Sequence, residues 1–172
     1  MKFVLLSWLA LVGGEIHLGS GEVISDGTVL IENQKIVAVG QNLKLPAGAK
    51  KIDVSGKVVT PGLIETHTRL GLVEIGGVAG TNDADSGLSG PIRAAQRAAD
   101  SFNPASSVLP IQRHHGITAA LSAPSGGLVA GQAALIGLDG SLLDASAAMM
   151  TGWGGNGRGS RGASIALVRE CL

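Results

Sequence analysis

The sequence predicts an α/β protein in which a small β-domain, residues 1–60, is followed by alternating strands and helices, residues 61–172. Two observations predict this class. Short runs of β-branched and apolar residues, separated by polar turns, fill residues 9–60, a pattern typical of strands. From Pro61 onward, apolar runs of strand length alternate with stretches of helical periodicity, which is typical of βα units in a barrel or a doubly wound sheet.

The clearest element of the β-domain is a hairpin. Residues 27–32 and 35–40 are two β-branched runs around Asn33-Gln34. We therefore expect two antiparallel strands joined by a short polar turn. Further strands are predicted over residues 51–54 and from Val58.

The N-terminus allows two interpretations. Lys2 precedes an apolar run, Phe3 to Val12, which has the form of a signal-peptide core with a cleavage site after Gly14. The same run continues into Glu15-Ile16-His17 and could equally be a buried first strand. It is shorter than the roughly 20 apolar residues that a membrane span needs. A cytoplasmic location is the default expectation, and export follows if residues 1–14 act as a signal peptide.

The region after Pro61 begins with a predicted buried strand. This strand is apolar at Leu63-Ile64 and becomes polar over residues 65–69. A loop rich in Gly, Asn, Asp and Ser follows, and Pro91 then opens a predicted helix, because proline is favoured at the first helical position. The apolar face of that helix comprises Ile92, Ala95, Ala98 and Ala99. The later predicted elements are a helix over residues 105–114 that ends at Gly116, strands over 117–123 and 131–138, and a helix from Ala163.

Composition excludes several classes of function. The 13 Lys and Arg balance 13 Asp and Glu, so no basic excess indicates nucleic-acid binding. With 27 Gly, two Phe, two Trp and no Tyr, the core must be aliphatic, which suits a packed α/β protein better than an aromatic-lined binding module. The single cysteine, Cys171, cannot form an internal disulfide and has no catalytic context.

The candidate chemistry lies where the strand after Pro61 becomes polar. Side chains alternate along a strand, so Glu65, His67 and Arg69 are expected on one side of it. In a parallel barrel, inward residues at the carboxyl ends of strands form the active site. This spacing alone also fits a hydrogen-bonded core histidine at His67, and that alternative stays open.

Several segments resemble one family. Residues 60–67, Thr-Pro-Gly-Leu-Ile-Glu-Thr-His, resemble the first-strand motif of the amidohydrolase superfamily, Pro-Gly-Leu-Ile-Asp-x-His-x-His. Imidazolonepropionase-like amidohydrolases are the most similar, over about residues 11–172. Further similar segments are residues 26–31, 35–40, 53–60, 116–121, 124–127 and 130–134. The resemblance implies an N-terminal fragment: residues 1–60 would be the N-terminal part of an incomplete composite β-sandwich, and residues 61–172 the first βα units of a truncated (β/α)8 metal-dependent hydrolase barrel.

The resemblance also implies a chemistry. In the family, the His-x-His pair binds a divalent metal, here expected to be zinc, which activates water to attack a non-peptide C–N carbonyl. Only His67 carries over as a ligand, because Arg69 replaces the second histidine and a guanidinium has no lone pair to give. Arg69 would instead suit a substrate carboxylate. The family's general base lies beyond residue 172.

The departure at Arg69 leaves two functions open. One is the hydrolase, and the other is a catalytically inactive member or gene remnant with a binding or structural role. A (β/α)8 barrel takes about 250 residues, so this chain alone is expected to be inactive and unstable. The whole protein is expected to act on a small-molecule substrate, without nucleic-acid or membrane partners, and is a candidate homo-oligomer.

Weaker motifs receive structural interpretations. Adjacent His114 and His115 would point about 100° apart on a helix, so helix-end charge is favoured over a metal site. Residues 157–162 spell G-x-G-x-x-G, which would indicate nucleotide binding only after a clear strand, and none precedes it. Residues 80–85 lack the spacing of a calcium loop, and Ser125 is not in a nucleophile elbow.

Overall fold

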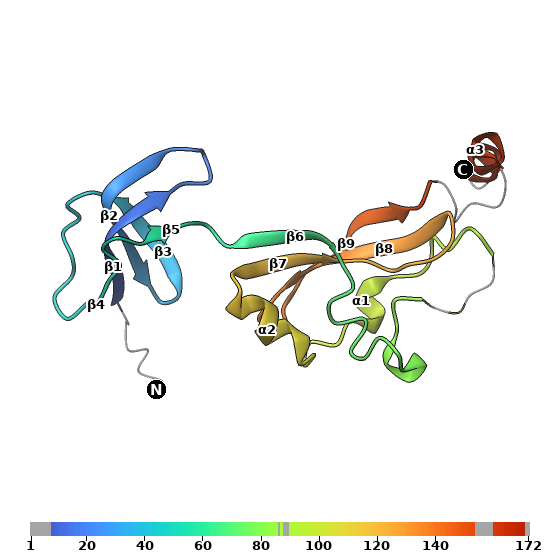
Figure 1. The fold of residues 1–172 in the computed structure, drawn as a ribbon, viewed down its shortest axis with the longest axis horizontal. Coiled ribbons are helices and arrows are strands. Elements are labelled where there is room, and N and C mark those ends of the chain that lie inside the picture. Colours follow the sequence, from blue (N-terminus) through green and yellow to red (C-terminus); the bar gives the residue numbers. More distant parts are fainter. Residues whose placement is uncertain (1–7, 86, 88–89, 154–159, 171–172) are drawn as a thin grey trace, which may run out of the picture. The chain divides into compact units, whose positions relative to one another are not determined.

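The computed structural model describes residues 8–85, 87, 90–153 and 160–170. The chain divides into two compact units, Met1–Pro61 and Gly62–Leu172 (Figure 1). Each unit is described by itself below. Among the described residues, no helix combines the length and the apolar character needed to cross a membrane.

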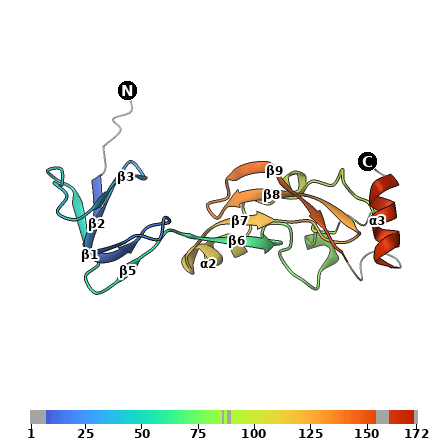
Figure 2. The same cartoon turned by 90° about the horizontal axis from the view of Figure 1, so that it is seen from above.

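The first unit is a five-stranded sheet with the order β3-β2-β1-β4, in which β5 also pairs with β1 (Figure 2). Strands β1, β2 and β3 are antiparallel neighbours, whereas β4 and β5 run parallel to β1. The strands are β1 (Trp8–His17), β2 (Val23–Glu32), β3 (Lys35–Gly40), β4 (Lys50–Asp53) and β5 (Val58–Val59).

The hairpin predicted over residues 27–40 is confirmed as β2 and β3. Asn33 and Gln34 have φ values of 47° and 67°, so both turn residues are in the left-handed region that a tight two-residue hairpin turn requires. The predicted first strand is also confirmed, because β1 lies at the centre of the sheet. Its buried residues Ala10 and Ile16 are 0% and 3% exposed.

The second unit is a four-stranded sheet with the order β6-β7-β8-β9. Strands β6 and β7 are parallel, and β7, β8 and β9 are antiparallel neighbours. The strands are β6 (Leu63–Thr68), β7 (Ile117–Ser122), β8 (Val129–Gly137) and β9 (Leu142–Thr151); the helices are η1 (Ala79–Thr81), α1 (Ala98–Ser101), α2 (Val108–His114) and α3 (Arg161–Glu170). Two mixed sheets with few helices confirm the predicted fold class, an α/β chain that begins with a small β-domain.

The second unit alternates strands and helices only between β6 and β7. After β7 the chain continues as an antiparallel hairpin, β8 and β9, and β9 was not predicted. Loop length explains the change of direction. Only residues 123–128 join β7 to β8, whereas a parallel crossover needs a dozen or more residues.

The predicted helix from Pro91 is wrong for most of its length. Helix α1 is confined to Ala98–Ser101, and residues 92–97 form a turn whose two ends, Ile92 and Arg97, bridge to β8. Strand β7 pairs only with residues 134–137 of β8, which leaves the first half of β8 open on that side. The backbone N–H of Gln132 donates to the carbonyl of Gln96 at 2.7 Å, so these polar backbone groups find partners in the sheet rather than in a helix.

The core of the second unit is aliphatic, as the composition predicts. Helices α1 and α2 lie against one face of the sheet, α1 on β8 and β9 and α2 on β7 (Figure 1). The predicted second helix is confirmed as α2, and Gly116 follows it with a φ of 91°. The buried core residues are Leu72, Ala84, Ala98, Leu109, Ala120, Ala134, Ile136 and Leu138.

Strand β6 differs from the buried strand that the sequence predicts. It lies at the edge of the sheet and pairs with β7 alone. Leu63 and Ile64 are 60% and 63% exposed. More than half of each of these two apolar side chains is thus uncovered within the described residues.

Candidate functional site

The candidate site lies at the carboxyl ends of β6 and β7. The two strands are parallel, so both end at the same edge of the sheet. Two hydrogen bonds hold this edge together: the N–H of Ala123 donates to the carbonyl of Thr68 at 2.8 Å, and the hydroxyl of Ser122 donates to the carbonyl of Leu70 at 2.7 Å. The segment that carries His67 and Arg69 is therefore fixed beside the loop that follows β7.

An open hollow lies at this edge, and we call it the His67 hollow. It encloses about 460 Å³ and is lined by His67, Thr68, Arg69, Ala123, Pro124 and Ser125. Two of the three predicted site residues, His67 and Arg69, thus come together here. Glu65, the third, does not line the hollow.

Glu65 is engaged with the backbone. Its Oε1 accepts a hydrogen bond from the backbone N–H of His67 at 3.1 Å, and its side chain is half-buried. His67 itself is exposed within the described residues. Its imidazole is therefore accessible to a ligand in the hollow.

Arg69 has an accessible guanidinium. The ion pairs found among the described residues join His17 to Glu15, Arg93 to Asp85 and Arg97 to Asp100. Arg69 belongs to none of these pairs. Within this part of the chain, its positive charge is not neutralised by a neighbouring carboxylate.

A metal ion requires several donors at one place. Among the described residues, no group of three or more His, Cys, Asp or Glu side chains is arranged to hold a metal. His67 supplies one imidazole to the hollow, and the guanidinium of Arg69 supplies no lone pair. These residues therefore do not complete a metal site by themselves.

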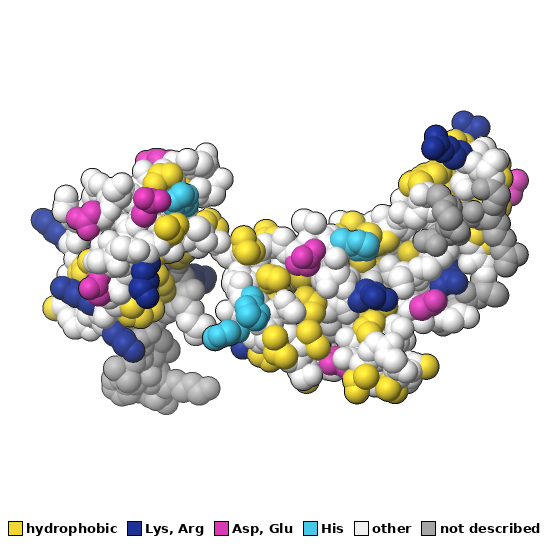
Figure 3. All heavy atoms as spheres, in the orientation of Figure 1, with side chains coloured by type: hydrophobic (Ala, Val, Ile, Leu, Met, Phe, Trp, Pro, Cys, Tyr) yellow, Lys and Arg dark blue, Asp and Glu magenta, His cyan; other side chains and the backbone are white. Residues whose placement is uncertain are grey.

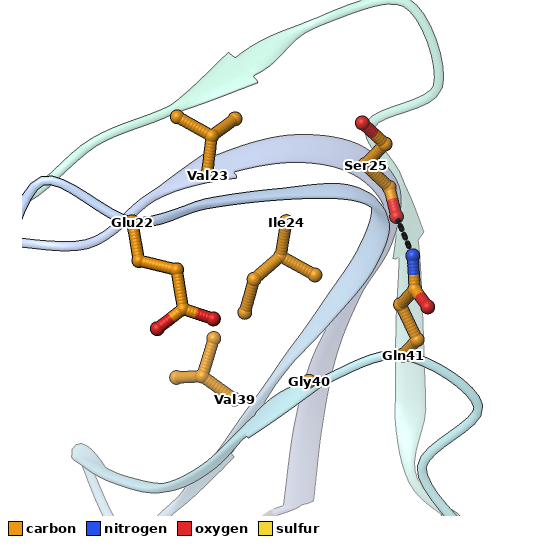
Figure 4. Close-up of a pocket in the computed structure, with 7 residues that line it drawn as sticks. All are labelled: Glu22, Val23, Ile24, Ser25, Val39, Gly40 and Gln41. Carbon is orange, nitrogen blue, oxygen red and sulfur yellow. Dashed lines mark hydrogen bonds between the residues drawn. The ribbon is translucent and has the colours of Figure 1, made fainter.

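The other hollows offer less chemistry. Figure 4 shows one in the first unit, with Glu22 at one end and Gln41 at the other. The side-chain amide of Gln41 already donates to the carbonyl of Ser25 at 2.7 Å. A third hollow, in the second unit, is lined by Asp83, Asp85, Ala95, Gln96, Arg97, Asp100 and Ser101. Its charged groups are of both signs.

The weaker sequence motifs do not form a further candidate site among the described residues. His114 and His115 form an edge-to-face pair with ring centroids 5.9 Å apart at the exposed end of α2. Gly157 and Gly159 of the G-x-G-x-x-G segment lie outside the described residues, as does Cys171. On the face shown in Figure 3, charged side chains of the described residues are scattered among uncharged atoms and form no continuous basic surface.

Sequence reasoning overlooked the role of Ser125. From the sequence it was weighed as a nucleophile and as part of the similar segment 124–127, and the structure brings it to the His67 hollow as a lining residue. The available signal was its position directly after a second strand parallel to β6. Residues that follow neighbouring parallel strands meet at one edge of the sheet, whatever their separation in sequence.

The chain is similar to several curated enzymes, although no family model matches it. It is 46% identical over 61 residues to an imidazolonepropionase of Alkaliphilus metalliredigens, covering 33% of this chain and 13% of that protein. It is 36% identical over 75 residues to a 5-methylthioadenosine/S-adenosylhomocysteine deaminase of Symbiobacterium thermophilum, covering 41% and 17%. An allantoinase of Enterococcus faecalis is 40% identical over 62 residues, covering 36% and 13%.

A solved structure supports the same relationship at the level of fold. An amidohydrolase of Thermotoga maritima superimposes with a TM-score of 0.80 at 21% identity, covering 94% of this chain and 46% of that one. The chain therefore spans less than half of the solved amidohydrolase and a smaller share of the curated relatives. The chain is therefore similar to imidazolonepropionases and other amidohydrolases over part of their length.

Proposed function

We propose that the chain is part of a metal-dependent hydrolase that acts on non-peptide C–N bonds of a small molecule. The observation that carries the proposal is the position of His67. It stands exposed in a hollow at the carboxyl end of β6, within the Pro-Gly-Leu-Ile-Glu-Thr-His segment. Homology to proteins named imidazolonepropionase, allantoinase and deaminase supports the reaction class.

In this proposal, His67 is a ligand of a divalent metal, for which zinc is the first candidate. A bound divalent metal supplies activated water at neutral pH. The remaining ligands and the general base come from polypeptide outside these 172 residues. The chain's own contribution is to fix the backbone that carries this imidazole, through the backbone N–H of His67 that donates to Glu65 and the pairing of β6 with β7.

The two units have separate roles in this proposal. Residues 1–60 form the N-terminal part of a β-sandwich domain, and residues 61–172 begin a barrel. The division of the chain after Pro61 and the parallel pairing of β6 and β7 support this assignment.

The second candidate is a catalytically inactive superfamily member with a binding or structural role. Arg69 favours it, because a permanently protonated guanidinium in the His67 hollow opposes a cation placed beside it.

Metal analysis of the full-length protein separates the two candidates. We expect purified protein to carry zinc, manganese or iron, and His67→Ala to lose both metal and hydrolysis of a panel of cyclic and linear amides. His114→Ala is the matched control, because His114 is a histidine of the same unit that lies outside the His67 hollow. A metal-free protein whose function is unchanged by His67→Ala would favour the inactive member.

A further inference from the structure

We propose that the His67 hollow is a carboxylate-binding subsite in which Arg69 and Ser125 are the ligands. The substrate would then carry a carboxylate close to the C–N bond that is broken. That the bound carboxylate belongs to a substrate rests on the proposed function. The anion site itself rests on the residues of this chain alone.

Arg69 supplies the charge. Arg69 lines the hollow and is exposed, and none of the ion pairs among the described residues includes it. A guanidinium presents parallel N–H donors that match the two oxygens of a carboxylate. None of the six described residues that line the hollow carries a carboxylate, so an entering anion meets no like charge in its walls.

Ser125 supplies a second donor from the loop that follows the neighbouring strand, β7. Its backbone N–H donates to the carbonyl of Ala84 at 2.8 Å, which fixes its position. Its hydroxyl lies 3.5 Å from the same carbonyl, at the outer limit of a hydrogen bond. The backbone is therefore anchored while the hydroxyl can turn to a ligand with little loss.

The Arg93 side chain packs against the backbone next to Ser125. Arg93 forms an ion pair with Asp85 at 2.7 Å, and its side chain is only 13% exposed. Its Nη1 would lie 2.7 Å from a Cβ added at Gly126, so the guanidinium packs directly against the backbone next to Ser125. Gly126 also has a φ of 91°, a conformation that favours glycine. The backbone that carries Ser125 is thus fixed before a ligand arrives.

The test measures binding by the full-length protein, using isothermal titration calorimetry with matched pairs. The pairs are pyroglutamate and its amide, N-acetylglycine and its amide, and hydantoin-5-acetate and its amide. We expect the carboxylate of at least one pair to bind about tenfold or more tightly than its amide, as a charge-assisted hydrogen bond implies. Inorganic phosphate is the comparison anion.

Substitutions in the hollow test whether the preference for carboxylates over amides arises there. Arg69→Gln should abolish it, Arg69→Lys should retain part of it, and Ser125→Ala should weaken it severalfold. Arg97→Gln is the matched control, because Arg97 is exposed in the same unit but lines a different hollow. The proposal is overturned if carboxylates and amides bind alike or not at all, if phosphate binds better than every carboxylate, or if Arg69→Gln keeps the preference.

Hydrolysis of the same compounds is followed in parallel. A carboxylate preference without any hydrolysis would remove the proposed function and leave the subsite standing. Hydrolysis of both members of a pair, bound with equal affinity, would remove the subsite and leave the proposed function standing.

Discussion

Ser122 is expected to connect the candidate site to the stability of the second unit. The residue is 0% exposed, and its hydroxyl donates to the carbonyl of Leu70 at 2.7 Å. Ser122→Ala removes the donor and leaves that carbonyl without its partner inside the unit. The loss of a buried hydrogen bond with one partner left unsatisfied costs about 1–3 kcal/mol.

Ser146 offers a matched comparison. Its hydroxyl donates to Oε1 of Gln132 at the same distance, 2.7 Å, but this bond is exposed on β9. Water can replace it, so Ser146→Ala should change the free energy of unfolding by less than about 0.5 kcal/mol. The two variants therefore differ in burial and share the bond length.

Urea denaturation of the full-length protein, followed by circular dichroism, measures both changes as shifts of the midpoint at constant slope. Ser122→Ala should also weaken the binding of any ligand in the His67 hollow, because Leu70 directly follows Arg69. Equal destabilisation by the two substitutions, or none by Ser122→Ala, would show that burial of this hydroxyl does not set its contribution.

Two further predictions concern acid and the isolated chain. The hydroxyl and then the backbone N–H of Ser141 hold the pKa of Asp139 below its ordinary value of 3.8. This stabilising contribution is complete above pH 3.8 and is lost as the pH falls through the lower folded-state pKa, so Asp139→Asn should flatten the acid limb of stability against pH below about 4. Acid titration of the unfolding midpoint measures this, and an unchanged limb would contradict it. The 172 residues expressed alone should aggregate or melt without cooperativity, because the edge strand β6 leaves apolar side chains exposed; a sharp cooperative melt of a monomer would contradict this.

The elements that depend on residues close together in the sequence could be predicted from the sequence. The hairpin over residues 27–40 follows from two β-branched runs and a turn whose residues tolerate positive φ. Helix α2 and the strand after Gly116 were likewise readable from apolar spacing and a glycine stop. These features depend on neighbours in the chain.

Long-range pairing decided the elements that were wrong or missed. Residues 92–97 have helical spacing but bridge at both ends to the free half of β8, which cannot be known before β7 and β8 are paired. Strand β9 contains an alanine-rich stretch with weak strand propensity, and pairing with β8 stabilises it.

The candidate site was half predictable for the same reason. His67 and Arg69 were found from period-two spacing at a strand end, which is a local pattern. Glu65 shares that spacing but is turned to the backbone N–H of His67, a choice that spacing does not encode. Ser125 reaches the hollow only through the parallel pairing of β6 with β7.

The backbone amide of Ser125, which donates to the carbonyl of Ala84, can be used to follow ligand binding in the His67 hollow by hydrogen exchange. That bond joins the loop after β6 to the loop after β7 by a single backbone N–H. The exchange rate of this amide proton with deuterated water therefore measures how often this bond opens. A ligand that bridges Arg69 and Ser125 holds both sides of the junction, so its occupancy can be followed at one amide without a chemical assay.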